Sequence, residues 1–163
     1  MKDHNLISKK RLNRLRQQGY KKQNDAELSK LAFGNRFAFI ICTSLLLIGI
    51  GSQNITLLSV MLGIAFLGVI LPYHPFDYIY NYIVVPNTKR PKLPRRSEQL
   101  KFACTMASLF IASIIFLFIN NFNTAAYTVS AILLVIAVLV GTTDFCLPSI
   151  MYNRLFLKNK PRP

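Results

Sequence analysis

The chain has 163 residues, which is enough for one domain, and 52% of them are hydrophobic while only six are Asp or Glu. This balance excludes an ordinary soluble domain, because helices with so few charges leave no polar face for water. The formal net charge of +14 indicates either membrane topology or nucleic-acid binding. We favour topology and expect no nucleic-acid partner, because no stacking aromatics are interleaved with the basic residues.

The first segment, residues 1–30, is a basic arm in which Lys and Arg alternate with Leu6, Ile7, Leu12 and Leu15. One interpretation is a basic amphipathic helix that lies on the membrane surface. The glycine and the many polar residues of the arm also fit a tail that is partly disordered. We expect a partly disordered cytoplasmic arm and keep the surface helix as the alternative.

Two long stretches without charge follow the arm. Residues 37–73 and 102–143 contain no Asp, Glu, Lys, Arg or His, which is typical of segments inside a bilayer. Each stretch is too long for one crossing and is interrupted by a short polar group, at 51–54 and at 120–124, so each is predicted to form a helical hairpin. The predicted fold class is all-α, an integral membrane bundle of four transmembrane helices within residues 31–157. The spans are expected at about 36–50, 55–71, 99–119 and 125–143.

The basic residues indicate how this bundle is oriented. Ten Lys and Arg lie in residues 1–36, six in 89–101 and four in 154–162, and none lies in the two polar connectors. Because basic loops stay inside, both termini, the loop at 73–98 and the basic tail at 158–163 are predicted to be cytoplasmic. We expect a bacterial inner-membrane protein that contacts anionic lipid at its cytoplasmic face.

The two hairpins end in similar sequences, which indicates an internal repeat. The first closes with YHPFDYIYN at 73–81 and the second with FCLPSIMYN at 145–153. When the Tyr-Asn pairs are aligned, His74 falls opposite Cys146. Because both halves enter and leave on one side, the repeat would be parallel, about an axis along the membrane normal. His74 and Cys146 are then expected to be neighbours or to flank one pocket.

Three cysteines, Cys42, Cys104 and Cys146, are expected to be free thiols near the cytoplasmic ends of their helices. Cys42 and Cys104 are interpreted as small packing residues. Cys146 is the candidate nucleophile, because positive charge nearby would lower the pKa of its thiol. His74 is the candidate for proton transfer near neutral pH, with Asp144 to orient or deprotonate it. No spacing supports a metal site, and we expect neither a metal nor another cofactor.

Charged residues at the same level of the bundle are expected to form ion pairs. A carboxylate at the end of a span is costly unless it reaches headgroup water or a cation. A structural ion pair is therefore the alternative to a chemical role for Asp144. The residues expected in such pairs are Arg36, Lys101, Asp77 and Asp144.

The segment after the second span is predicted to lie along the cytoplasmic surface. A short helix should begin at Pro75 and end before Pro86, because the residue before a proline disfavours helix. Amphipathic rings prefer the membrane interface. The expected interface anchors are Tyr73, Tyr78, Tyr80 and Tyr82. The residues expected to contact anionic lipid or an acidic partner are Lys89, Arg90, Lys92, Arg95 and Arg96.

Three motifs in order carry a resemblance to a known family. They are PYHPFDYIYNY, LPRRSEQLKFACTMAS and GTTDFCLPSIMYN. Together they resemble a family of bacterial inner-membrane proteins called domain of unknown function 4395, over about residues 33–156. Relatives often have histidine in place of Asp144, and some have a second cysteine in place of Ser149, so this chain departs from a metal site and from a two-thiol couple. Some relatives look like thioredoxin-like or sulfur-handling proteins, which the resemblance transfers to Cys146 as an expectation.

Three functions fit these observations. The favoured one is a non-catalytic accessory or scaffold protein that presents a cytoplasmic rim to an unknown protein partner or to a second copy of itself. The alternative is a thiol-dependent or sulfur-handling membrane redox protein that uses Cys146 with His74 and Asp144. A small transporter is the second alternative, against which stands the lack of charged residues at mid-membrane. An enzyme is not excluded, but the chain carries no complete catalytic motif.

The predicted topology can be tested with reporter fusions. Alkaline phosphatase fused at Asn121 should be active, because the connector at 120–124 is predicted to be periplasmic. A fusion within the loop at 73–98 should be inactive. The reverse pattern of activities would contradict the predicted orientation.

Overall fold

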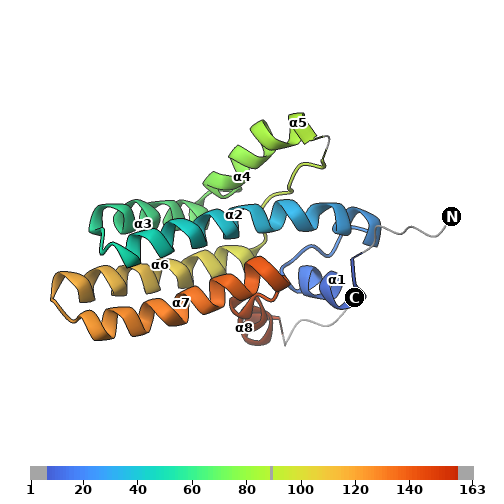
Figure 1. The fold of residues 1–163 in the computed structure, drawn as a ribbon. Helices are drawn as coiled ribbons and strands as arrows, with labels where there is room; N and C mark the ends of the chain where they lie inside the picture. Colours follow the sequence, from blue (N-terminus) through green and yellow to red (C-terminus); the bar gives the residue numbers. More distant parts are fainter. Residues whose placement is uncertain (1–6, 89, 158–163) are drawn as a thin grey trace.

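Four long helices lie side by side and form the body of the protein (Figure 1). The computed structural model describes residues 7–88 and 90–157, which contain helices and connecting segments and no strand. The helices are α2 (Asp25–Gly51), α3 (Ile55–Ile70), α6 (Glu98–Ile119) and α7 (Asn123–Thr143). Helix α3 packs on α6 and α7 packs on α2, and each helix also packs on its partner in the hairpin. The predicted all-α class and the two predicted hairpins are both observed.

Polar N-cap side chains mark where three of these helices, α2, α3 and α6, begin. The Asn24 side chain accepts a hydrogen bond from the Glu27 N–H and the Glu27 carboxylate accepts one from the Asn24 N–H, a capping box that opens α2. Asn54 and Ser97 cap α3 and α6 in the same way with one hydrogen bond each. Helix α2 therefore begins eleven residues before the predicted first span, because a capped and partly buried turn precedes the apolar run.

Three of the helices, α2, α6 and α7, are long and apolar enough to cross a membrane. Helix α3 has 16 residues and reaches that standard only together with the segment Pro75–Thr88, which is bent from it by 78°. At a rise of 1.5 Å per residue, α3 is about 24 Å long. The structure therefore has three candidate crossings, or four if the bent pair counts as one.

Shorter helices form a cap at the end of the bundle that carries both termini. Helix α1 (Lys9–Gln17) lies in the arm that was expected to be partly disordered, and Leu12 and Leu15 on it are buried against α2 and Leu100. Its apolar side faces the protein rather than a membrane surface. Helix α8 (Leu147–Phe156) packs on α6 and touches α1. The predicted basic tail at 158–163 lies outside the described residues.

The remaining elements form an arm that leaves the bundle after α3 (Figure 1). It consists of α4 (Pro75–Ile79), a π-helical turn η1 (Tyr80–Val84) and α5 (Val85–Thr88), and we call residues 75–88 the surface arm. The predicted helix was expected to end before Pro86. The helical segment instead runs past Pro86 to Thr88, and the π-helical turn η1, in which the Val85 N–H donates to the Tyr80 carbonyl, directly precedes the proline.

The arrangement of α4 and α8 fits the predicted parallel repeat. Helix α4 packs on α2 in the first half as α8 packs on α6 in the second. His74 is the N-cap residue of α4 and Cys146 is the N-cap residue of α8, and a proline stands in the first turn of each helix. The two aligned residues therefore occupy the same structural position in their halves.

Gly34 and Gly63 differ in how closely other side chains surround them. A Cβ at Gly34 would lie 2.7 Å from the Tyr80 ring, whereas a Cβ at Gly63 has no neighbour within 4 Å. We expect Gly34→Ala to lower the free energy of unfolding by about 1–3 kcal/mol through overpacking. Gly63→Ala should leave it unchanged or raise it by up to about 1 kcal/mol through helix propensity. Denaturant titration of both variants in detergent, followed by circular dichroism, measures the difference, and equal midpoints would contradict this packing.

Candidate functional site: a thiol-lined cavity

An apolar cavity of about 110 Å³ lies between the long helices, near the end of the bundle that carries the cap. Its walls come from α2, α3, α6 and α7 and are mostly aliphatic and aromatic. All three cysteines of the chain line it. His74 and Arg96 also line it, so thiols, an imidazole and a guanidinium meet in one apolar space.

Arg96 is fixed by a buried ion pair. Its Nε donates to Asp77 Oδ2 at 2.7 Å and its Nη2 lies 3.4 Å from Asp77 Oδ1, and both side chains are only 6% exposed. Burial alone would lower the pKa of Arg96, but Cys104 and Asp77 raise it above its ordinary value. Arg96 was expected to contact lipid or a partner. It lies inside the protein instead, because the buried Asp77 carboxylate requires a cation.

The third nitrogen of Arg96 reaches a thiol. Nη1 of Arg96 donates to Cys104 Sγ at 3.2 Å. Cys104 is buried on α6, two turns after the residue that caps this helix. Charge-assisted hydrogen bonds stabilise the ionised form of their acceptor. Cys104, interpreted from the sequence as a packing residue, is therefore the thiol with a positive group directly on its sulfur.

His74 is held in a neutral form beside this pair. Its Nδ1 accepts a hydrogen bond from the Phe76 N–H at 3.3 Å, and its own backbone N–H donates to Asp77 Oδ2 at 3.1 Å. Burial, with Arg96 in addition, lowers the pKa of His74 to about 4, although Asp77 opposes the shift. The imidazole is therefore uncharged near neutral pH, and the positive charge of the site comes from Arg96.

The imidazole also lies close to Cys104. A Cβ built on Gly68 of α3 would meet His74 Cδ2 at 2.5 Å and Cys104 Sγ at 3.0 Å. Both groups therefore lie over the same glycine, which has no side chain to separate them. Their approach depends on residue 68 being glycine.

Cys146 has a different environment. It is 3% exposed and accepts a hydrogen bond from Ser149 Oγ at 3.1 Å. Burial raises the pKa of the Cys146 thiol, and the hydrogen bonds from Ser149 oppose that rise without reversing it. The cations expected to activate Cys146 have other partners, since Arg36 pairs with Asp144 and Lys101 lies 3.9 Å from Glu98.

Asp144 belongs to a second cluster, next to the cavity but not among its lining residues. Its carboxylate is fully buried and accepts from Arg11 Nε at 2.9 Å and from Arg36 Nε and Nη2 at 2.8 Å each. It ends α7 in the left-handed conformation, with φ of 57°. Asp144 therefore does not orient His74, whose carboxylate partner is Asp77. Arg11, which supplies this contact from α1, was not predicted.

Side chains of Arg14, Gln18 and Arg36 also donate hydrogen bonds to the backbone carbonyls at the C-terminal end of α7. Arg14 Nη1 donates to the Thr143 carbonyl at 2.7 Å, Arg36 donates to the Thr142 carbonyl, and Gln18 Nε2 donates to the Asp144 carbonyl at 2.7 Å. Cations at a helix C-terminus are favourable because the helix dipole is negative there. The cluster contains the ion pair between Arg36 and Asp144 that the alternative for Asp144 expected.

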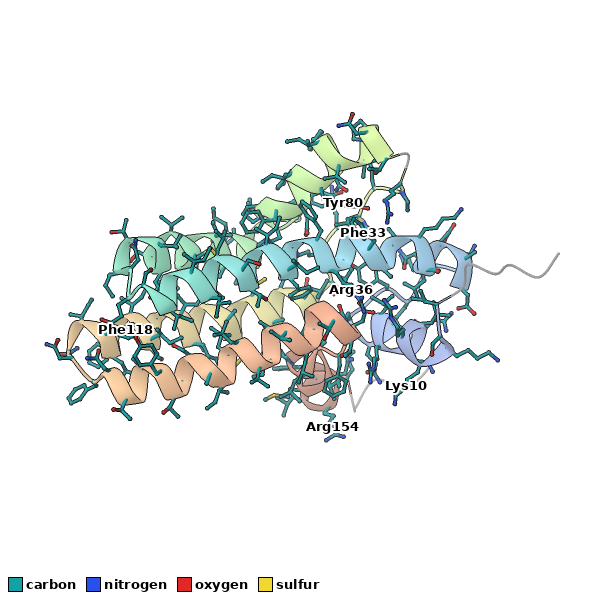
Figure 2. The ribbon with its side chains drawn as sticks, viewed as in Figure 1. Lys10, Phe33, Arg36, Tyr80, Phe118 and Arg154 are labelled. Atoms are coloured by element: carbon teal, nitrogen blue, oxygen red, sulfur yellow. The ribbon has the colours of Figure 1, made fainter. Side chains whose placement is uncertain are left out.

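The predicted interface tyrosines divide into two groups. Tyr73 and Tyr78 are partly exposed and Tyr82 is exposed. Tyr80 has no exposed surface and packs against Phe33 and Phe37, with ring centroids 6.4 Å and 5.5 Å away (Figure 2). Tyr80 is therefore a packing residue between the surface arm and α2, not an interface anchor. Lys89, expected to contact lipid, lies outside the described residues.

Residues 33–156 match the family described as a domain of unknown function, DUF4395. This range covers more than half of the chain. The chain belongs to this family. No curated protein and no solved structure matches it. Among the residues that the structure describes, no three His, Cys, Asp or Glu side chains are arranged to hold a metal ion. The function of this DUF4395 protein must therefore be argued from the cavity itself.

The Asp144 cluster predicts a stability effect. We expect Asp144→Asn to lower the free energy of unfolding by about 2–3 kcal/mol, because Arg11 and Arg36 lose a buried partner while asparagine still tolerates the left-handed backbone. The cost stays below that of a fully buried pair, since the two arginines are 32% and 20% exposed. Denaturant titration in detergent measures it.

Asp25→Asn is the matched control for this substitution. Asp25 forms an ion pair with Arg16 in which both side chains are largely exposed, so its loss should cost less than about 1 kcal/mol. Equal losses of stability in the two variants would contradict a structural role for the buried cluster.

Proposed function

We propose that the chain crosses the bacterial inner membrane four times, with both termini and the cap in the cytoplasm. The three long apolar helices support this arrangement, and so does the position of Lys and Arg, none of which lies in the two hairpin turns. Helix α3 makes the fourth crossing if the bilayer thins slightly around it, because its length of about 24 Å is close to the hydrocarbon thickness of about 30 Å. The cavity would then lie just inside the cytoplasmic boundary.

Within this membrane setting we propose a thiol-dependent protein with Cys104 as its nucleophile. The observation that supports it is the hydrogen bond from Arg96 to Cys104 inside an apolar cavity that the other two thiols also line. The Arg96 guanidinium favours the thiolate form of Cys104, whereas burial of the sulfur away from water opposes it. Asp77 holds the guanidinium in place, so no reorganisation is needed when the thiol loses its proton.

The cavity favours a small and largely apolar substrate. Its volume is about 110 Å³ and its walls are mostly aliphatic and aromatic, with Arg96 as the cationic side chain of the lining. In the proposed step the Cys104 sulfur forms a bond to an electrophilic carbon or sulfur of the substrate. The leaving group departs with the electrons of the broken bond and takes up the thiol proton. Cys146, held by Ser149, is the second thiol that could receive the group from Cys104.

A second candidate keeps the accessory role. A hollow on the cap is lined by Lys21, Lys22 and Arg95, among other residues, and both lysines are exposed. Its charge suits an acidic segment of a partner protein. Deleting residues 86–96 would not test this role cleanly, because it would also remove Arg96 from the cavity. Lys21→Glu with Lys22→Glu should abolish binding of an acidic partner while the reactivity of Cys104 stays unchanged.

The thiol proposal predicts a ranking of alkylation rates. N-Ethylmaleimide, a small and membrane-permeant electrophile, should modify Cys104 about tenfold more slowly in the double variant Arg96→Gln and Asp77→Asn than in the wild type. The double substitution avoids leaving the Asp77 carboxylate buried without a partner. Mass spectrometry of the three cysteine peptides during a time course measures each rate in native membranes.

The chain supplies its own controls for this experiment. Arg95→Gln changes the exposed neighbour of Arg96 and should leave the rate unchanged. Cys42 lines the same cavity and reports access of the reagent. An unchanged Cys104 rate in the double variant, or an equal fall at Cys42 and Cys104, would overturn the proposed role of Arg96.

A further inference from the structure

The surface arm, residues 75–88, leaves the bundle after α3 and projects away from the long helices (Figure 1). The arm is bent from α3 by 78°. Its 14 residues span about 21 Å as a helix, which is too short to cross a bilayer core of about 30 Å. If α3 crosses the membrane, an element bent this far from α3 lies closer to the plane of the membrane than to its normal.

The two sides of the surface arm differ sharply. Phe76, Tyr80 and Val85 face the protein and are buried. Ile79, Tyr82 and Ile83 face outward and are 41%, 71% and 59% exposed, and Figure 2 shows the side chains of this segment projecting away from the bundle. A helix that faces water normally carries charges on its outer side.

The outer side of the surface arm carries no charge. The only charged residue in 75–88 is Asp77, whose carboxylate is buried against Arg96. Helix α3, which precedes the arm, also carries exposed apolar residues, among them Phe66 and Ile70 at 57% and 60%. Exposed apolar side chains are therefore present both on a proposed membrane helix and on the arm that follows it.

The arm is held in this orientation at its start and near its middle. At its start, Asp77 is fixed by Arg96. Near its middle, the Asn81 amide pairs with the backbone of Leu93, accepting from the N–H at 2.7 Å and donating to the carbonyl at 3.3 Å. Its outward side is consequently a fixed surface and not one of several positions of a loose loop.

Basic residues follow the arm at once. Arg90, Lys92 and Arg95 are exposed. The guanidinium of Arg90 lies 4.0 Å from the centroid of the Phe33 ring, and Lys92 Nζ lies 5.9 Å from that of Tyr82. Apolar and aromatic side chains beside exposed cations are typical of elements that lie in the headgroup region of an anionic bilayer.

We propose that the surface arm lies in the cytoplasmic interface of the bilayer and binds anionic phospholipid. Tyr82 and Ile83 reach the boundary between headgroups and acyl chains, while Arg90 and Lys92 contact the lipid phosphates. The occupant of this surface is thus the lipid and not a second copy of the chain. The proposal concerns a surface outside the thiol cavity and stands independently of the thiol chemistry.

The chain contains no tryptophan, which permits a direct test. In the Tyr82→Trp variant the introduced indole is the single tryptophan of the full-length protein. After reconstitution into vesicles of phosphatidylcholine and phosphatidylglycerol, we expect a blue-shifted emission, weak quenching by acrylamide and strong quenching by lipid brominated near the headgroup. Phe66→Trp, on α3, should instead be quenched most by lipid brominated near the chain end, and Lys10→Trp, on the exposed side of α1, should be quenched by acrylamide alone.

Several results would overturn the proposal. Acrylamide quenching of the Tyr82→Trp variant equal to that of the Lys10→Trp variant would place the arm in water. Quenching that matches the depth of Phe66→Trp would make the arm part of a broken span. A blue shift that disappears when the protein is diluted with excess lipid would assign the surface to a second copy of the chain.

A second experiment tests the role of the basic residues. Bromolipid quenching of the Tyr82→Trp variant should increase when phosphatidylglycerol is added to phosphatidylcholine vesicles. The increase should disappear when Arg90→Gln and Lys92→Gln are combined with it, and should persist with the control substitution Lys30→Gln on α2. An increase that persists without Arg90 and Lys92, or no increase in the parent variant, would overturn the proposed lipid contact.

Discussion

The ion pair between Arg96 and Asp77 connects the surface arm, the segment that leads into α6 and the cavity. Asp77 belongs to the surface arm and Arg96 to the segment that leads into α6, so the pair joins the two halves of the chain where the central loop could otherwise move freely. Its near-complete burial makes each partner indispensable to the other, since a lone charge in that environment is very costly. The remaining nitrogen of Arg96 then determines the electrostatic character of the cavity.

The two ends of the repeat show how one framework can hold two kinds of site. In the first half, His74 caps α4 and the side chain three residues later is Asp77, which binds a cation. In the second half, Cys146 caps α8 and the side chain three residues later is Ser149, which binds the sulfur. The start of α4 therefore carries the Asp77–Arg96 ion pair, whereas the corresponding start of α8 carries a hydrogen bond between a hydroxyl and a thiol. This asymmetry gives the cavity one cationic wall.

The sequence was sufficient for the hairpins, because stretches without charge and polar breaks are properties of continuous segments. It also placed Arg36 and Asp144 at one level of the bundle, because Arg36 directly precedes one apolar run and Asp144 directly follows the other. It did not reveal Arg11, which reaches Asp144 across 133 residues, nor that Arg96 lies inside while its neighbour Arg95 is exposed. The contact of Arg11 depends on how α1 folds back onto the end of α7. The sequence of a basic run does not reveal which of its residues is buried. The available signal for the thiol contact was that α6 begins just after Arg96 and that Cys104 lies about two turns into this helix.

The contacts of α1 with the end of α7 have a consequence for how the protein is made. Arg11, Arg14 and Gln18 bind residues 143 and 144, so an early part of the nascent chain waits for partners synthesised more than a hundred residues later. At translation rates of about 5–20 residues per second, that delay is roughly 6–27 seconds. During this interval the basic arm has no acidic partner in its own chain at that position. Its closure therefore requires that α7 is complete, and a chain that ends before α7 would differ from the full chain by an open, positively charged segment around α1.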